Sequence, residues 1–213
     1  SCADKKDACE GIRLHGDIHR KRLLPKIPYL GSSLISMYSK CGLLAKAREV
    51  LEELPIRDIF SWNALISGYA SHGQGNEALN CYDQMLKEGL SPDQVSFVCV
   101  LKACGIIGSI EKGKDIHDEV ASSGLIEKDI VLGTALVDMY AKCGLLEKAR
   151  EVFDEFPVRN IISWNALITG YAQEGQYHEV LNSVDQMRSE GLSPDTVTFI
   201  CSLKACSNIG PFD

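Results

Sequence analysis

Apolar residues recur at helical spacing along the chain, in blocks that glycine and proline interrupt. One face of a helix carries residues at i, i+3, i+4 and i+7, and this spacing is met by Trp62, Leu65, Ile66 and Tyr69. Ser61 is placed to cap this helix. A second apolar stripe follows over residues 78–86 and stops at Gly89. Because no stretch shows the sustained alternation of a strand, the pattern predicts pairs of antiparallel helices and an all-α fold.

The whole pattern returns after 102 residues. Residues 37–58 (MYSKCGLLAKAREVLEELPIRD) reappear as residues 139–160 (MYAKCGLLEKAREVFDEFPVRN), and SWNALISGYA reappears as SWNALITGYA. Turn signals divide each period into helical pairs of 31, 35 and 36 residues. Repeated helical pairs stack into a solenoid, and we expect its function to lie in side chains that recur at one place in each repeat.

The unit lengths and local motifs together resemble the pentatricopeptide repeat family, and specifically its PLS subclass, in which P, L and S repeats alternate. The S-like units carry ALVDMYAKCG, the P-like units carry SWNALISGYA and end in EGLSPD, and the L-like unit carries LKAC and then EKGKDIH. The resemblance implies a right-handed α-solenoid superhelix of helix-turn-helix repeats. The predicted repeats are a partial L-type at 1–27, S-type at 28–58 and 130–160, P-type at 59–93 and 161–195, L-type at 94–129, and a partial L-type at 196–213.

The resemblance also implies sequence-specific binding of single-stranded RNA, at about one base per repeat. In this family the fifth and the last residue of a repeat recognise the base. Here they form four pairs: Ser32 with Asp58, Asn63 with Asp93, Thr134 with Asn160, and Asn165 with Asp195. All eight are small and polar, as hydrogen bonding to a base edge requires. The second residue of a repeat packs on base faces in the family, and the corresponding residues are Tyr29, Phe60, Val95, Val131, Ile162 and Val197.

The family's pairing preferences assign uridine to Asn with Asp, adenine to Thr with Asn, and guanine to Thr with Asp. Ser with Asp should resemble the last of these pairs. The predicted target is therefore 5′-GUNAU-3′, with N at the L-type repeat because its fifth residue, Val98, is apolar. Ile200 holds the same place in the last partial repeat. Family L repeats are linked to multiple organellar RNA editing factor proteins. The resemblance thus implies an adaptor in organellar RNA processing, chiefly recognition of C-to-U editing sites, in a plastid or mitochondrion.

Composition limits where RNA could bind. The net charge is −7, whereas nucleic-acid-binding proteins are usually basic, so phosphate contacts would have to be local. The candidates, each of which also suits a solvated surface role, are Lys40, Lys142, Arg48, Arg150, Arg57 and Arg159. The acidic charge keeps a protein-interaction scaffold open as the alternative function, and apolar faces at the repeat ends predict self-association. No run of about 18 apolar residues occurs, so no membrane span is predicted.

Catalysis is not predicted for this chain. The cytidine deaminase domain that follows many PLS arrays needs H-x-E and then P-C-x-x-C. Only the first half is met, at His117, and no C-x-x-C occurs anywhere. His117 also aligns with His15 as part of the L-type motif. The sequence therefore predicts no catalytic residue, no metal site and no cofactor.

Overall fold

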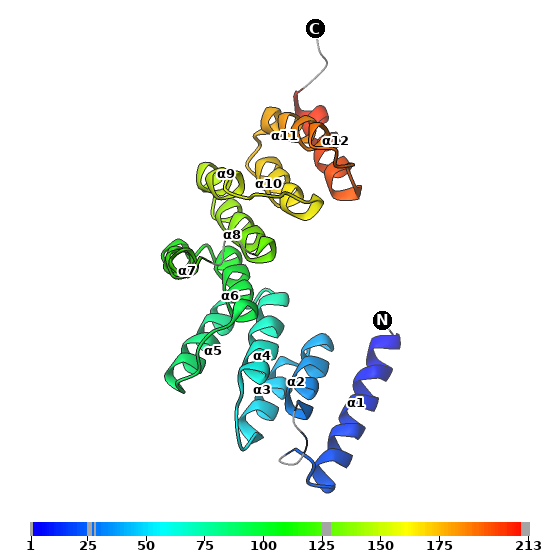
Figure 1. Cartoon of the computed structure of the whole chain (residues 1–213). Coiled ribbons are helices and arrows are strands. Elements are labelled where there is room, and N and C mark those ends of the chain that lie inside the picture. The colour runs from blue at the N-terminus through cyan, green and yellow to red at the C-terminus, as the bar shows by residue number, and fades with distance from the viewer. Residues whose placement is uncertain (1, 25–26, 28, 125–128, 210–213) are drawn as a thin grey trace. The chain divides into compact units, whose positions relative to one another are not determined.

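The computed structural model describes residues 2–24, 27, 29–124 and 129–209, with the backbone alone for residues 2–8. Over these residues it contains twelve α-helices and no strand, which confirms the all-α prediction (Figure 1). The helices are α1 (Cys2–Arg20), α2 (Leu30–Lys40), α3 (Leu44–Glu53), α4 (Ile59–Ser71), α5 (Gly75–Lys87), α6 (Gln94–Ile107), α7 (Ile110–Ser122), α8 (Ile130–Lys142), α9 (Leu146–Asp154), α10 (Ile161–Gln173), α11 (Tyr177–Ser189) and α12 (Thr196–Ile209). Within the described residues, no helix is both long and apolar enough to cross a membrane.

Several helices begin where a repeat is predicted to begin. Helices α4 and α10 begin at Ile59 and Ile161, where the two P-type repeats are predicted to begin. The division into P-, L- and S-type repeats itself stays a prediction. Pro28, at the predicted start of the first S-type repeat, lies outside the described residues, as do 125–128 and 210–213.

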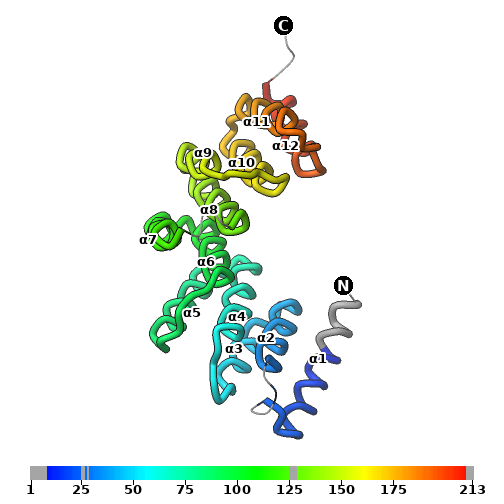
Figure 2. Tube along the Cα trace, viewed as in Figure 1, coloured from blue at the N-terminus to red at the C-terminus, as the bar shows by residue number. Residues whose placement is uncertain are grey.

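The chain forms two compact units, residues 1–103 and 104–213. In the first unit, α2 packs against α3 and α4, and α4 packs against α5. In the second unit, α8 packs against α9 and α10, while α10 packs against α11 and α12. Figure 2 traces these neighbouring helices within each unit. The first helices of successive hairpins therefore contact one another in both units, and the second helices cover their other side.

Glycine makes the tight turn between the two helices of a hairpin. Gly42 has φ +72° and Gly144 has φ +74°, a left-handed conformation that costs glycine little. The next residue closes the turn, because the Leu43 N–H donates to the Tyr38 carbonyl at 2.9 Å and the Leu145 N–H donates to the Tyr140 carbonyl at 2.9 Å. This bond satisfies a carbonyl that the helix end leaves without a partner. The chain can then reverse direction within two residues.

A buried tryptophan joins the two helices of each predicted P-type repeat. The indole Nε1–H of Trp62 donates to Glu88 Oε2 at 3.0 Å, and Glu88 Oε1 accepts from Arg57 Nη1 at 2.6 Å. The second copy repeats this arrangement with Trp164, Glu190 and Arg159, at 2.9 and 2.6 Å. Trp62 and Trp164 are both buried. They are core residues whose polar edge is satisfied, so they do not present a face for base stacking.

The N-terminus of α4 corrects one sequence prediction. Asp58, and not Ser61, is the N-cap, because its Oδ1 accepts from the Ser61 N–H at 2.8 Å. Ser61 completes a capping box by accepting from the Asp58 N–H at 3.0 Å. Asn160 and Ser163 form the same box at α10. The last residue of each predicted S-type repeat thus has a structural role that does not depend on any ligand.

Candidate functional site

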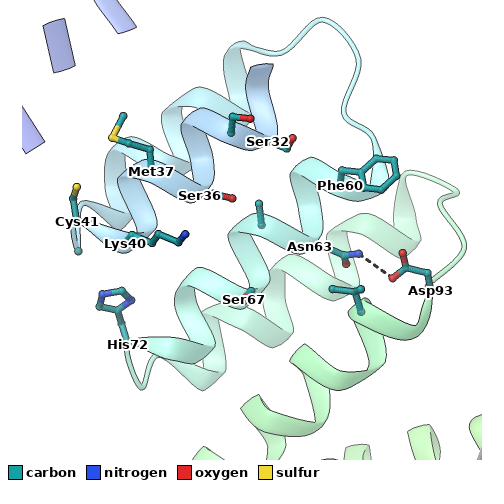
Figure 3. A pocket seen from close by; sticks show the side chains of 14 residues that line it. Ser32, Ser36, Met37, Lys40, Cys41, Phe60, Asn63, Ser67, His72 and Asp93 are labelled. Atoms are coloured by element: carbon teal, nitrogen blue, oxygen red, sulfur yellow. Dashed lines mark hydrogen bonds between the residues drawn. The ribbon is translucent and has the colours of Figure 1, made fainter. Parts of the chain in front are cut away.

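An open groove in the first unit runs along α2, α4 and the start of α6. Its volume is about 1120 Å³. Figure 3 shows Ser32 and Ser36 on α2 facing Asn63 and Ser67 on α4, with Asp93 beside Asn63. The groove therefore collects polar side chains from the first helices of neighbouring hairpins.

The predicted pair Asn63 and Asp93 is brought together in this groove. Asn63 Nδ2 donates to Asp93 Oδ1 at 2.9 Å, although the two residues lie 30 positions apart. A third residue completes the cluster, because the Ser96 hydroxyl donates to Asn63 Oδ1 at 2.7 Å. The Ser96 N–H also donates to Asp93 Oδ1 at 2.9 Å, which makes Asp93 the cap of α6. Both ends of the Asn63 amide are therefore engaged.

The second unit builds the same cluster from the repeated residues. Asn165 Nδ2 donates to Asp195 Oδ1 and Oδ2 at 3.0 and 2.9 Å, and the Thr198 hydroxyl donates to Asn165 Oδ1 at 2.7 Å. The Thr198 N–H donates to Asp195 Oδ1 at 3.1 Å. The hydroxyl residue is Ser in one cluster and Thr in the other. The asparagine also differs, because Asn63 is buried and bonds one carboxylate oxygen, whereas Asn165 is partly exposed and reaches both.

Hydrogen bonds hold both carboxylates in the ionised form. Burial alone would raise the pKa of Asp93, but bonds from the Ser96 backbone, the Asn63 amide and the Ser96 hydroxyl outweigh it and lower that pKa. The pKa of Asp195 is lowered chiefly by the Thr198 backbone N–H, with the Asn165 amide and the Thr198 hydroxyl adding to it. Each cluster therefore carries a negative charge at neutral pH.

The pairs in the predicted S-type repeats are arranged differently. No hydrogen bond joins Ser32 to Asp58 or Thr134 to Asn160, all four of which are described residues, and the Ser32 hydroxyl instead donates to the Tyr29 carbonyl at 2.9 Å. Asp58 and Asn160 each bond the backbone of the following helix. All four side chains are partly exposed. The structure thus brings together two of the four predicted pairs by direct hydrogen bonds.

The six predicted base-packing residues are all exposed to solvent. Their exposed fractions range from 43% at Val197 to 70% at Ile162. The remaining members are Tyr29, Phe60, Val95 and Val131. Tyr29 and Phe60 also contact each other edge to face, with ring centroids 5.4 Å apart. Apolar side chains left exposed beside recurring polar clusters indicate a surface that a planar, partly apolar ligand could cover.

The basic residues that were candidates for phosphate contact divide into those that bond another side chain and Lys40, which lines the groove. Arg57 and Arg159 pair with glutamates, while Arg48 and Arg150 bond Gln84 and Gln186 of the next hairpin at 2.9 and 3.0 Å. Lys142 pairs with Asp138 at 2.6 Å, one helical turn away. Lys40 is exposed and lines the groove, where Ser36 takes the place of that aspartate. Lys40 is therefore the candidate best placed to meet a phosphate.

The fifth residues of the predicted L-type repeats, Val98 and Ile200, have no side-chain donor or acceptor for a base edge. Val98 is partly buried, and Ile200 is 61% exposed on α12.

His117 bonds the Tyr140 hydroxyl at 2.8 Å, and burial lowers the pKa of His117. The described residues contain no group of three His, Cys, Asp or Glu side chains that could hold a metal ion.

Ser96 and Thr198 are the site residues that the sequence prediction did not include. Both stand three positions after the last residue of a P-type repeat, where a hydroxyl is typical of an ordinary helix cap. Their recurrence at the 102-residue step was the available signal. The bond to an asparagine 33 positions earlier becomes visible only in the fold.

Two repeat-family models match most of the chain. The model described as "PPR repeat family" matches residues 57–105 and 159–208, and the model described as "PPR repeat" matches residues 32–59 and 134–161. A solved structure, that of the pentatricopeptide repeat protein PPR10 in complex with an 18-nt psaJ RNA element, shares the fold with a TM-score of 0.74. At 20% identity, the match covers 96% of this chain and 31% of PPR10.

Curated relatives from Arabidopsis thaliana carry the same family name. Pentatricopeptide repeat-containing protein At5g27110 is 38% identical over 100% of this chain and 30% of its own length. The mitochondrial At1g06140 is 39% identical over 94% of this chain and 36% of its length, and the chloroplastic At4g18520 is 39% identical over 93% and 32%. The chain thus spans about a third of the length of these relatives. On the matched repeats and their spacing, the chain belongs to the pentatricopeptide repeat family.

Proposed function

We propose that this chain binds single-stranded RNA along the exposed face of its first helices, with bases recognised at the paired positions. The observation that carries the proposal is the recurrence of one cluster, an Asn–Asp pair hydrogen-bonded beside exposed apolar side chains, in both units. In the first unit this cluster lies in the groove shown in Figure 3. PPR10, which shares the fold, was solved with an RNA element, and this supports the choice of ligand.

The polar groups of the cluster suit uridine. Asn63 Nδ2 has two N–H groups and gives one to Asp93, so the other remains available. Asp93 accepts the bonds described above through Oδ1, which leaves Oδ2 as an acceptor. The pairing edge of uridine presents an N–H donor between two carbonyl acceptors. An amide donor beside a carboxylate acceptor complements that edge.

The exposed apolar residues suit the faces of the bases. Phe60 and Val95 both line the groove that contains Asn63 and Asp93. A base placed against the Asn63 amide would therefore have apolar groups on its faces. Stacking on an aromatic side chain contributes about 1–3 kcal/mol per base, and the aliphatic positions should contribute less.

The finer assignments rest on the repeat pattern. We propose a PLS-type array in which the four pairs Ser32/Asp58, Asn63/Asp93, Thr134/Asn160 and Asn165/Asp195 bind 5′-GUNAU-3′ at about one base per repeat. Two relatives are named mitochondrial and chloroplastic, which supports action in an organelle. Within that setting we propose an adaptor role in RNA processing, chiefly at C-to-U editing sites, with multiple organellar RNA editing factor proteins contacting the L-type repeats.

A titration with short RNAs tests the proposal. Fluorescence anisotropy would compare 5′-GUNAU-3′ with a scrambled RNA and with an RNA carrying cytidine in place of the guanine. The matched RNA should bind several-fold more tightly than either, because each lost base contact removes hydrogen bonds worth about 0.5–1.5 kcal/mol each. Equal affinities for the three RNAs would show that the assignment is wrong.

A second candidate function is contact with another protein through α12. Phe199, Ile200 and Leu203 are all at least half exposed on this helix, and together they form an apolar face. Self-association through such a face would appear as a molar mass that rises with concentration in light scattering. A mass that stays monomeric at all concentrations would count against it.

A further inference from the structure

The two hydroxyl residues missed by the sequence prediction, Ser96 and Thr198, cannot contact RNA themselves. Both are 0% exposed. Each nevertheless donates to the carbonyl oxygen of the asparagine in a base-recognition pair, at 2.7 Å in both copies. Any effect they have on RNA must therefore act through the paired residues, Asn63 with Asp93 and Asn165 with Asp195.

An asparagine amide can present either a donor or an acceptor to a base. Its oxygen and nitrogen occupy nearly the same volume, and a rotation of half a turn exchanges them. In these clusters the carboxylate of Asp93 or Asp195 accepts from the nitrogen, while the hydroxyl donates to the oxygen. The two partners fix the amide from opposite ends, so only one orientation satisfies both.

The same hydroxyl position behaves differently where it follows a predicted S-type repeat, which provides a contrast within the chain. Ser61 and Ser163 occupy the third position after Asp58 and Asn160, as Ser96 and Thr198 do after Asp93 and Asp195. Their hydroxyls donate to the carbonyls of Asp58 and Asn160, at 2.8 and 2.9 Å, because no asparagine stands opposite them. In all four places the hydroxyl oxygen accepts from the N–H of the capping residue, and only the direction of its own proton differs. It turns to the fifth residue of the repeat where that residue is an amide.

We infer that Ser96 and Thr198 are positioning residues for base selectivity, whose buried hydroxyls hold the recognition asparagine with its second N–H, the one not given to the aspartate, directed at the base. The inference rests on the proposed RNA binding and goes beyond it, because it assigns a third side chain to each uridine position. Ser serves in one copy and Thr in the other, so the hydroxyl is the feature that the two copies share.

The test compares uridine with cytidine at one position at a time. In wild-type protein, dissociation constants would be measured for 5′-GUNAU-3′ and for RNAs with cytidine at the second or the fifth base. Ser96→Ala should reduce the preference for uridine about five- to tenfold at the second base only, which corresponds to one lost hydrogen bond. Thr198→Val, which removes the hydroxyl and keeps the side-chain shape, should do the same at the fifth base only. Ser96→Thr and Thr198→Ser should retain the wild-type preference.

The possible outcomes separate the inference from the proposed function. Uridine preference that survives in Ser96→Ala and Thr198→Val would overturn the positioning role and leave RNA recognition intact. Equal weakening toward uridine and cytidine, with the ratio unchanged, would show a purely structural role and would also overturn it. Absence of any base preference in wild-type protein would remove the proposed base recognition and the inference with it. Because Thr198→Val preserves shape, it keeps the test decisive if Ser96→Ala fails to fold.

Discussion

Replacing Asn63 with Thr while keeping Asp93 should change the preferred base at the second RNA position from uridine to guanine. The shorter side chain leaves room for a purine, and it no longer supplies the amide donor that complements uridine. In the family's pairing preferences, Thr with Asp favours guanine. The ratio of the two dissociation constants should shift by about ten- to a hundredfold, because each preference rests on one or two hydrogen bonds of about 0.5–1.5 kcal/mol.

The control for this change is Asn80→Thr. Asn80 is an exposed asparagine on the outer helix α5, so its substitution should leave base preference unaltered. Binding would be measured with four RNAs that differ only at the second base. Asn165→Thr should produce the same switch at the fifth base and none at the second. A variant Asn63→Thr that still prefers uridine at the second base would count against the assignment of this repeat.

Replacing Gly68 with Leu should destabilise the protein by about 3 kcal/mol. Gly68 lies where α4 meets α2, and a Cβ atom added there would come within 2.7 Å of Ser39 Cβ and still closer to Ser39 Oγ. The second unit has the same close approach, with Gly170 facing Ala141 Cβ at 2.6 Å from the added atom. Because Ile35, Leu65 and Ile66 are fully buried around this contact, the helices cannot move apart without exposing them.

Urea unfolding would measure this effect, and Gly16→Leu provides the control. A Cβ atom added at Gly16 of α1 would meet nothing within 4 Å, so this change should be neutral or stabilising by up to about 1 kcal/mol through helix propensity. An unfolding midpoint for Gly68→Leu equal to that of the wild type would show that the first helices do not depend on this contact. The repeat face that we propose for RNA would then be less rigid than the packing indicates.

Much of the fold follows from the spacing of apolar residues and glycines. The stripe of Trp62, Leu65, Ile66 and Tyr69 predicts the buried face of α4, and all four residues are buried. Gly42 predicts the end of α2 because its position after a helix suits a left-handed conformation. These features are local, so a sequence pattern is sufficient to place them.

The parts of the site that escaped prediction depend on contacts between distant residues. Ser96 has the pattern of an ordinary cap, and its bond to Asn63 exists only because α4 and α6 lie side by side. The sequence offers Arg57 for phosphate, but it pairs at 2.6 Å with Glu88, the residue that ends α5. The difference between Lys40 and Lys142 was, by contrast, readable in the sequence, because Ser36 and Asp138 stand one turn before them.

The most direct test of RNA binding by the first helices is to observe the asparagine side-chain amides by NMR as RNA is added. At saturation with 5′-GUNAU-3′, the Nδ2–H resonances of Asn63 and Asn165 should shift, because these groups are proposed to contact the bases. Those of Asn80 and Asn182, exposed on α5 and α11, should stay in place. Unchanged resonances of Asn63 and Asn165 in saturated protein, or shifts confined to Asn80 and Asn182, would contradict the proposal that the first helices bind RNA.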